Sequence, residues 1–363
     1  GDVYKRQISG LGLGMSTLWE GLCAGRSCLK PLTRFDASGW PCKLGGEVEN
    51  FSAKDHVPKS YRKAVKVMAR DIELAIGAAK DAVADAKLVT RGTIEESGAA
   101  GTPTYPGIRM GCHIGAGLIA AEDEELAAAF TNSRREGEPE RFDLRAWGKS
   151  GMESLTPLWL LKYLPNMLSC HVTIIHGCAG PSNTITCSEA SGLLSIGESL
   201  RVIERGDADL CFSGGAESKL NPMSLTRLDF AKRLAHTGDQ TDGSKIVRPF
   251  DPRSPGGLLG EGGGIVVLEG MDAAQARGAS AYAEIVGFGA AHSPMRSVVP
   301  DENNEEPDEG FEFAVLNALD DAEVKPDEID AVVVLGSGVR NIDLPEAGAL
   351  SRVFGRAWHE CRW

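Results

Sequence analysis

Apolar positions along the chain follow two patterns, which together predict strands followed by helices. Short, mainly apolar runs next to glycines predict strands at residues 109–115, 208–213, 262–269, 282–287 and 329–335, of which those at 208–213 and 329–335 are predicted to be buried. Apolar residues spaced three and four apart predict helices at residues 63–88, 155–168, 190–205 and 309–320. Continuous apolar strands between helices predict an α/β protein with a mostly parallel sheet that is covered on both faces.

The connecting segments predict two related halves. Polar stretches with glycine and proline predict loops at residues 90–106 and 134–147. The turn at residues 253–257 is the best position for a join, which divides the chain into residues 1–253 and residues 254–363.

Composition and charge exclude several classes of function. The chain has 363 residues, with 38 Lys and Arg against 51 Asp and Glu, and a net charge of −13. This acidity argues against binding to nucleic acid or to an anionic membrane surface. No stretch is apolar for the length of a membrane span, and the nine cysteines have no metal-binding spacing. We therefore expect a cytoplasmic protein with reduced thiols and no bound metal or cofactor.

Three familiar catalytic and nucleotide-binding patterns fail. Gly148-Lys149-Ser150 ends like a phosphate loop, but Asp143 stands where the first glycine is required. The GxGxxA pattern at residues 115–120 lacks an acidic residue at a second strand end, since Glu140 lies in a polar segment. A close-packed turn is the better interpretation of these glycines. No GxSxG motif is present, so the nucleophile of an α/β-hydrolase is absent.

A specific combination of motifs lies between residues 180 and 217. It runs Gly180-Pro181, a strand, Ser191-Gly192, a helix, Gly206-Asp207-Ala208-Asp209, a strand and Gly214-Gly215-Ala216-Glu217. This stretch resembles the β-ketoacyl-acyl carrier protein synthase family, which has the thiolase fold. Similar matches cover nearly the whole chain, including Arg248-Pro249-Phe250-Asp251, Gly260-Glu261-Gly262, Ala276-Arg277-Gly278-Ala279 and residues 282–289. The resemblance implies five α/β/α/β/α layers, here without the last part of the C-terminal half.

Two positions depart from the family pattern. Without gaps between Gly180 and Gly192, the position of the catalytic cysteine holds Glu189, and the position of a catalytic histidine holds Leu335. The chain ends before the family's lysine and second histidine. A thiolate at a helix N-terminus attacks a thioester and forms a reactive acyl ester, whereas a carboxylate would have to form a high-energy anhydride. Leucine has no donor that could polarise a thioester carbonyl.

The remaining cysteine, glutamate and histidine candidates are each expected to have a structural rather than a catalytic role. Cys187 lies before the helix start, so we expect a small buried hydrophobe there, with a catalytic role as the alternative. We expect Glu217 to bond to backbone near the strand–helix turn, and we expect the closely spaced His176 and Cys178 to be incidental. His236 and His292 are isolated in the sequence, which is typical of surface or satisfied core histidines.

The resemblance therefore implies a family member of fatty-acid or polyketide biosynthesis that is a non-condensing partner subunit, similar to a chain-length factor. A synthase with residual decarboxylase or acyltransferase activity is one alternative, and an acyl-carrier-protein binding module is another. The implied partners are an acyl carrier protein, whose phosphopantetheine carries the substrate, and a cysteine-bearing synthase in a heterodimer, with a homodimer also possible. Family members dimerise through the strand before the helix start, here residues 180–186.

Overall fold

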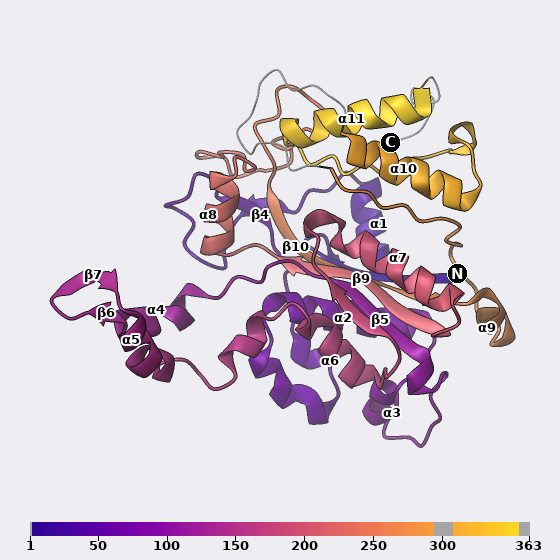
Figure 1. Cartoon of the computed structure of the whole chain (residues 1–363), viewed down its shortest axis with the longest axis horizontal. Coiled ribbons are helices and arrows are strands. Elements are labelled where there is room, and N and C mark those ends of the chain that lie inside the picture. The colour runs from indigo at the N-terminus through magenta and orange to yellow at the C-terminus, as the bar shows by residue number, and fades with distance from the viewer. Residues whose placement is uncertain (1, 294–307, 356–363) are drawn as a thin grey trace.

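A mixed eight-stranded sheet forms the centre of the protein, in a computed structural model that describes residues 2–293 and 308–355 (Figure 1). The main strand order is β2-β1-β10-β9-β5-β8, and β4 joins β10 at one end and pairs with β3. The strands are β1 (Asp2–Ser9), β2 (Gly12–Leu13), β3 (Leu29–Pro31), β4 (Leu44–Gly46), β5 (Met110–Gly115), β8 (Ser182–Ile185), β9 (Leu210–Ser218) and β10 (Leu259–Glu269).

The expectation of a mostly parallel sheet is wrong. β5 is parallel to β8 and β9, but β10 is antiparallel to both β1 and β9. Apolar runs report that both faces of a strand are buried, and they carry no information on strand direction. Because β10 pairs with strands of the N-terminal half, it belongs to the same sheet as the candidate site; the division at residues 253 and 254 stays a prediction.

Helices cover both faces of this sheet. Figure 1 shows α2 (Arg70–Asp85) and α6 (Met167–His176) on one face and α7 (Ser191–Glu204) on the other. α2 is buried along most of its length, because its small and branched side chains pack beneath β1, β9 and β10. The remaining helices are α1 (Met15–Cys23), α3 (Arg91–Ser97), α4 (Asp123–Thr131), α5 (Leu144–Ala146), α8 (Pro222–Phe230), α9 (Met271–Ala276), α10 (Glu309–Ala322) and α11 (Arg340–Phe354).

Two helix predictions are confirmed and two have wrong bounds. α7 and α10 match the predictions at residues 190–205 and 309–320. The helix predicted from residue 63 begins at Arg70, after the 3₁₀ helix η2 (Lys59–Val67), and the one predicted at residues 155–168 is the 3₁₀ helix η5 (Trp159–Tyr163) followed by α6. A 3₁₀ helix also places residues three apart on one face, so apolar spacing does not separate it from an α-helix.

A second set of layers lies beyond α7. A Cβ atom on Gly197 of α7 would lie 2.2 Å from the Phe288 ring, and one on Gly289 would lie 2.0 Å from Ala314 O of α10. Residues 287–289 therefore run between these two helices. α10 and α11 pack together above them (Figure 1). The helices thus follow the expected α/β/α/β/α order, but extended segments without ladder pairing stand where the second sheet was expected.

The strands predicted at residues 282–287 and 329–335 are not formed. Val332 and Val334 pack against Leu350 and Phe354, but Val333 between them is 99% exposed. A strand needs neighbours for its backbone hydrogen bonds, and within the described residues neither segment is part of the main sheet. The mainly apolar segment at residues 329–335 thus has one half-buried face instead of two buried ones.

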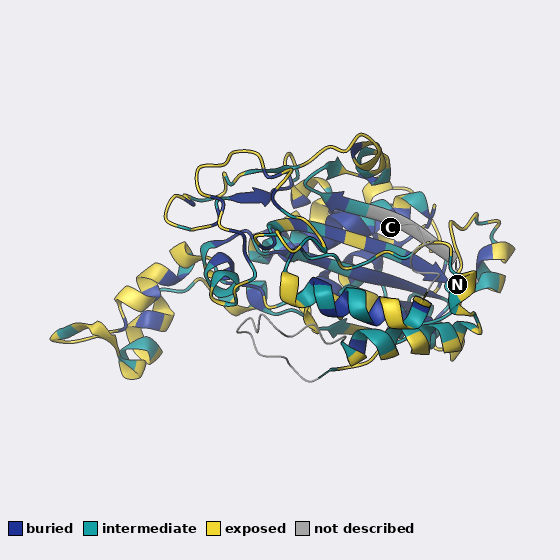
Figure 2. Ribbon diagram, turned by 90° about the horizontal axis from the view of Figure 1, so that it is seen from above, coloured by how far each residue is buried: buried dark blue, intermediate teal, exposed yellow. Residues whose placement is uncertain are grey.

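The two predicted loops contain regular structure. Residues 90–106 include α3, and residues 134–147 include the hairpin of β6 (Arg134–Arg135) and β7 (Glu138–Phe142) and also α5. Figures 1 and 2 show α4, α5 and this hairpin projecting from the body of the protein. The rings of Phe130, Phe142 and Trp147 contact one another there, in a surface cluster in which Phe130 and Phe142 stay largely exposed.

Candidate functional site

The site is centred on the turn between β8 and α7, which we call the elbow (residues 186–190). Ser188 has a left-handed φ of 53° and begins the 3₁₀ helix η6 (Ser188–Ala190), which leads directly into α7. Ser191 fixes the turn: its Oγ accepts a hydrogen bond from Cys187 N and donates one to Ser188 O, both at 2.7 Å. The elbow therefore presents the side chains of Ser188 and Glu189 at the N-terminal end of α7.

Glycines allow the start of α7 to lie directly on the sheet. A Cβ atom on Gly115 of β5 would lie only 2.4 Å from the Ser191 carbonyl carbon. Gly214 of β9 has a φ of 138°, and a Cβ atom there would lie 2.1 Å from Gly264 O of β10. A side chain at Gly115 would push the helix start away from the sheet, and one at Gly214 would push β9 and β10 apart. The glycines that resembled a nucleotide loop are thus a close-packed turn, as the sequence predicted.

Glu189 is held as a carboxylate at the elbow. One oxygen accepts a hydrogen bond from Ser188 Oγ at 2.6 Å, and the other accepts one from Arg233 Nη2 at 2.5 Å. Burial alone would raise the pKa of Glu189, but the Ser188 hydroxyl and the Arg233 charge lower it to about 2. The helix N-terminus favours the same charge state. At neutral pH this position therefore carries a fixed, ion-paired negative charge.

Arg233 reaches the elbow because of how α8 ends. Lys232 follows α8 with a left-handed φ of 55°, and Arg233 N then donates to Leu228 O at 3.0 Å. Arg233 O accepts a hydrogen bond from Gly257 N at 3.0 Å. The sequence analysis missed Arg233, and no motif identifies it, since the ion pair spans 44 residues of sequence.

Two pockets meet at the elbow. The larger has a volume of about 510 Å³ and a glycine-rich floor from β5, β9 and β10; its walls include Glu189, Glu217, Leu193 and Ile196. The smaller has a volume of about 340 Å³ and includes Lys219 and Arg227 in its lining. Ser188, Ala116 and Gly117 line both pockets.

The structure does not bring Leu335 into either pocket. Leu335 is 44% exposed, in the extended segment after Val334. Its N–H donates to Glu346 of α11 at 2.7 Å, and Gly336 N donates to the same carboxylate at 3.2 Å. The following residues bond to Asp343, which accepts from the N–H groups of Ser337 and Gly338 at 2.8 and 3.0 Å.

This loop and the elbow are connected through one glycine. A Cβ atom on Gly257 would lie 3.1 Å from Ser337 O, and Gly257 N bonds to Arg233 O. The positions of Glu189 and Leu335 are thus linked through Arg233 and Gly257 rather than by direct contact. Asp343 and Glu346 lie three residues apart on one face of a helix. This Asp-x-x-Glu spacing is the sequence pattern that could have indicated that their carboxylates accept hydrogen bonds from the backbone of this loop.

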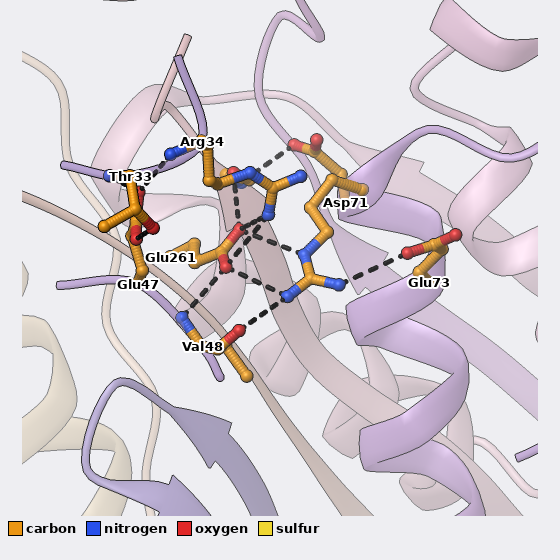
Figure 3. Close-up of polar contacts among 9 residues, drawn as sticks. Thr33, Arg34, Glu47, Val48, Asp71, Glu73 and Glu261 are labelled. Atoms are coloured by element: carbon orange, nitrogen blue, oxygen red, sulfur yellow. Dashed lines mark hydrogen bonds and ion pairs between the residues drawn. The ribbon is translucent and has the colours of Figure 1, made fainter. Parts of the chain in front are cut away.

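A buried cluster of charges anchors β10 beside the site (Figure 3). Glu261 has a fully buried side chain and accepts hydrogen bonds from Arg34, Arg70, Val48 N and Ser218 Oγ at 2.9–3.2 Å. Burial raises the pKa of Glu261, but the bonds and charges of Arg70 and Arg34 outweigh it and leave the pKa below its usual value. The cluster joins α2 and two loops to β10. The residues that follow Glu261 on this strand, 262–264, form part of the floor of the larger pocket.

Two interpretations of single residues need correction, whereas the histidines agree with theirs. Cys187 is exposed at the elbow rather than buried, because it lies in the turn after β8, which is the last strand in the main sheet order. The Glu217 carboxylate pairs with Lys219 Nζ at 2.8 Å, and among the described residues no backbone N–H donates to it. His236 is exposed and pairs with Asp229, and His292 is exposed, as expected for surface histidines. His176 is buried and bonds to Thr90 Oγ1 at 3.0 Å.

Within the described residues, no helix is both long and apolar enough to cross a membrane, and no three potential metal ligands cluster.

Comparison with known proteins agrees with this architecture. The sequence model of the β-ketoacyl synthase N-terminal domain matches residues 8–274, and that of the C-terminal domain matches residues 282–362. The chain belongs to the β-ketoacyl synthase family. The predicted family and its thiolase-like fold are thereby confirmed.

Similar proteins include two 3-oxoacyl-[acyl-carrier-protein] synthases and a ketosynthase/chain length factor. The chain is 31% identical over 350 residues to 3-oxoacyl-[acyl-carrier-protein] synthase 2 of Staphylococcus aureus, with 96% of this chain and 77% of that protein covered. It is also 31% identical to the protein of that name from Synechocystis sp., with coverages of 98% and 78%. The solved ishigamide ketosynthase/chain length factor superposes with a TM-score of 0.74 at 28% identity, covering 98% of this chain and 78% of that chain.

Proposed function

We propose that this protein is a non-condensing subunit of a β-ketoacyl synthase, which pairs with a cysteine-bearing family member in fatty-acid or polyketide biosynthesis. The observation that carries the proposal is the ion-paired Glu189 carboxylate at the elbow. Condensation begins with transfer of an acyl group from a thioester to a nucleophile that later releases it, and a thiolate is suited to both steps. A carboxylate with a pKa of about 2 is a weak nucleophile, and its acyl product would be an anhydride.

A second substitution supports the same conclusion. Leu335 stands where the resemblance places a histidine, and it has no donor with which to polarise a carbonyl group. Its segment is held by backbone hydrogen bonds to Glu346, so the loop is ordered without a catalytic side chain. A site that lacks both nucleophile and electrophile is expected to shape a partner's reaction rather than to perform its own.

The pairing surface that we propose is the free edge of β8. β8 ends the main sheet order and pairs with β5 on one side, so its other side offers backbone groups to a further strand. Ser182 and Asn183 are exposed on this strand and Ile185 is half-buried at its end. A two-fold related homologue would continue the sheet across this edge through backbone hydrogen bonds, in an interface that we expect to bury about 2,000 Å² or more in total.

The names of the relatives support the proposed partners. The two curated relatives are named for acyl carrier protein substrates, and the ishigamide structure contains a ketosynthase with a chain-length factor. We therefore propose an acyl carrier protein as the source of the substrate, carried on phosphopantetheine, and a heterodimer as the working assembly.

Co-expression tests the proposal. A tagged form of this chain should co-purify in a 1:1 complex with a cysteine-bearing synthase encoded beside it. Ile185→Asp should abolish the complex by placing an unpaired charge at the joined sheet edge. Leu22→Asp is the matched control, because Leu22 is exposed on α1, outside this edge. If the chain instead forms a stable homodimer and the synthase co-purifies no better than an unrelated protein, the subunit proposal is wrong.

A further inference from the structure

The smaller pocket at the elbow has an unusual lining for a protein of net charge −13. It contains two cationic side chains, Lys219 and Arg227, and three hydroxyl groups, from Thr186, Ser188 and Ser224. No acidic residue is part of the lining. The neighbouring larger pocket has the opposite character, with Glu189 and Glu217 and no basic residue.

The two cations retain most of their hydrogen-bonding capacity. Among the described residues no carboxylate pairs with Arg227, whose guanidinium donates to Ser224 Oγ at 3.3 Å and has further N–H groups to offer. Lys219 pairs with Glu217 at 2.8 Å, which uses one of its three donors. Both side chains are half-buried, so their charges act in a less polarisable environment than bulk water.

Apolar side chains complete the wall. Ala116 and Leu118 come from the turn after β5, and Leu228 comes from the same face of α8 as Ser224 and Arg227. The volume of about 340 Å³ exceeds what a single inorganic anion would fill. A ligand that satisfies both parts of the wall has an anionic end and an apolar stem.

We propose that this pocket binds a carboxylate carried on a short apolar chain, with Arg227 and Lys219 holding the carboxylate and Leu118 and Leu228 contacting the stem. The proposal deepens the proposed function and rests on it for the source of the ligand, because an acyl chain that stays on the phosphopantetheine of an acyl carrier protein can present such an end without transfer to the elbow. Arg227 and Lys219 then act as specificity residues that favour acid-ended chains over chains that end in a methyl group.

Direct binding to the full chain tests this proposal. Calorimetric titration at constant ionic strength compares hexanoate, hexanamide and inorganic phosphate. Hexanoate should bind at least about tenfold more tightly than hexanamide, since hydrogen bonds to charged groups contribute more than neutral ones. Phosphate, which has no apolar stem, should bind more weakly than hexanoate.

Variants assign the effect to the pocket. Arg227→Gln and Lys219→Gln should each weaken hexanoate binding by about tenfold, the size expected for one charged hydrogen bond. Arg145→Gln is the matched control, because Arg145 is an exposed arginine on α5 of the projecting hairpin region. Circular dichroism of each variant confirms folding, and the Lys219 variant serves if the Arg227 variant does not fold.

Equal binding of hexanoate and hexanamide, or equal effects of Arg227→Gln and Arg145→Gln, would overturn the proposal. Phosphate binding as tight as that of hexanoate would also overturn it, in favour of a bare-anion site. None of these measurements needs the partner synthase. A chain that co-purifies with the synthase but does not bind hexanoate refutes this inference alone, and the reverse result refutes the subunit proposal alone.

Discussion

Removing the guanidinium of Arg233 should lower the free energy of unfolding, because the Glu189 carboxylate loses its ion pair. In the folded protein the pKa of Glu189 falls from its ordinary value of 4.5 to about 2, a difference that corresponds to about 3 kcal/mol. The Glu189 and Arg233 side chains are 41% and 30% exposed, and Ser188 supplies part of the effect. Solvent screening therefore reduces the contribution of Arg233 to about 1 kcal/mol.

A double-mutant cycle measures this contribution. The free energy of unfolding in urea is determined for the parent chain, Glu189→Gln, Arg233→Gln and the double variant, and we expect a coupling energy of about 1 kcal/mol. The control cycle uses Arg205 and Asp207, whose side chains are both 54% exposed. That pair should couple by only a few tenths of a kcal/mol.

The coupling should also depend on pH in a defined direction. Because the folded-state pKa of Glu189 lies below its unfolded value, the stabilisation is complete above about pH 5 and is lost as the pH falls toward 2. A coupling energy near zero at pH 7, or one that grows as the solution is acidified, would refute the ion-pair account of the elbow.

Three further predictions concern the site and its support. Glu189→Cys should not restore condensation, because Leu335 still lacks a donor; 3-oxoacyl product formed by this variant would show that the histidine position is misassigned. Glu261→Gln should lower the free energy of unfolding by about 3–5 kcal/mol, because the guanidinium groups of Arg34 and Arg70 lose their carboxylate partner. Glu49→Gln is the control: Glu49 forms an exposed pair with Lys30, so this change should alter the free energy of unfolding by less than about 1 kcal/mol. Burial raises the pKa of Asp71 from 3.8 to about 7, so parent stability should fall as pH rises from about 4 to 7. Asp71→Asn should remove that slope in urea unfolding measured across this range, and an unchanged slope would contradict the assignment.

The sequence predicted the parts of the fold that depend on local pattern. α7 follows from apolar periodicity and β5 from a short run that ends at glycines, and the motifs from Gly180 to Glu217 identified the family from a single chain. Strand direction was not predictable in this way, since β10 is as apolar as a parallel strand yet lies antiparallel to both neighbours. The exposure of Val333 was also missed, because it depends on which layers pack against the segment.

The sequence likewise predicted one part of the candidate site and missed the rest. Glu189 was found because it occupies a fixed place in a motif. Arg233, which sets the charge state of Glu189, was missed because it arrives through the end of α8 from 44 residues away. The basic pocket was missed for the same reason, since Lys219 lies on the turn after β9 and Arg227 lies on α8. Contacts between distant segments determine the chemistry of this site, and periodicity does not report them.

The central claim is that the elbow accepts no acyl group. Its most direct test is intact-protein mass spectrometry of the chain alone, after incubation with an acyl-loaded acyl carrier protein, with a cysteine-bearing synthase treated in parallel. We predict the mass of one acyl group on that synthase and no added mass on this chain. An acyl adduct on this chain that disappears in Cys187→Ser would contradict the claim and would identify the exposed thiol beside Ser188 as a working nucleophile.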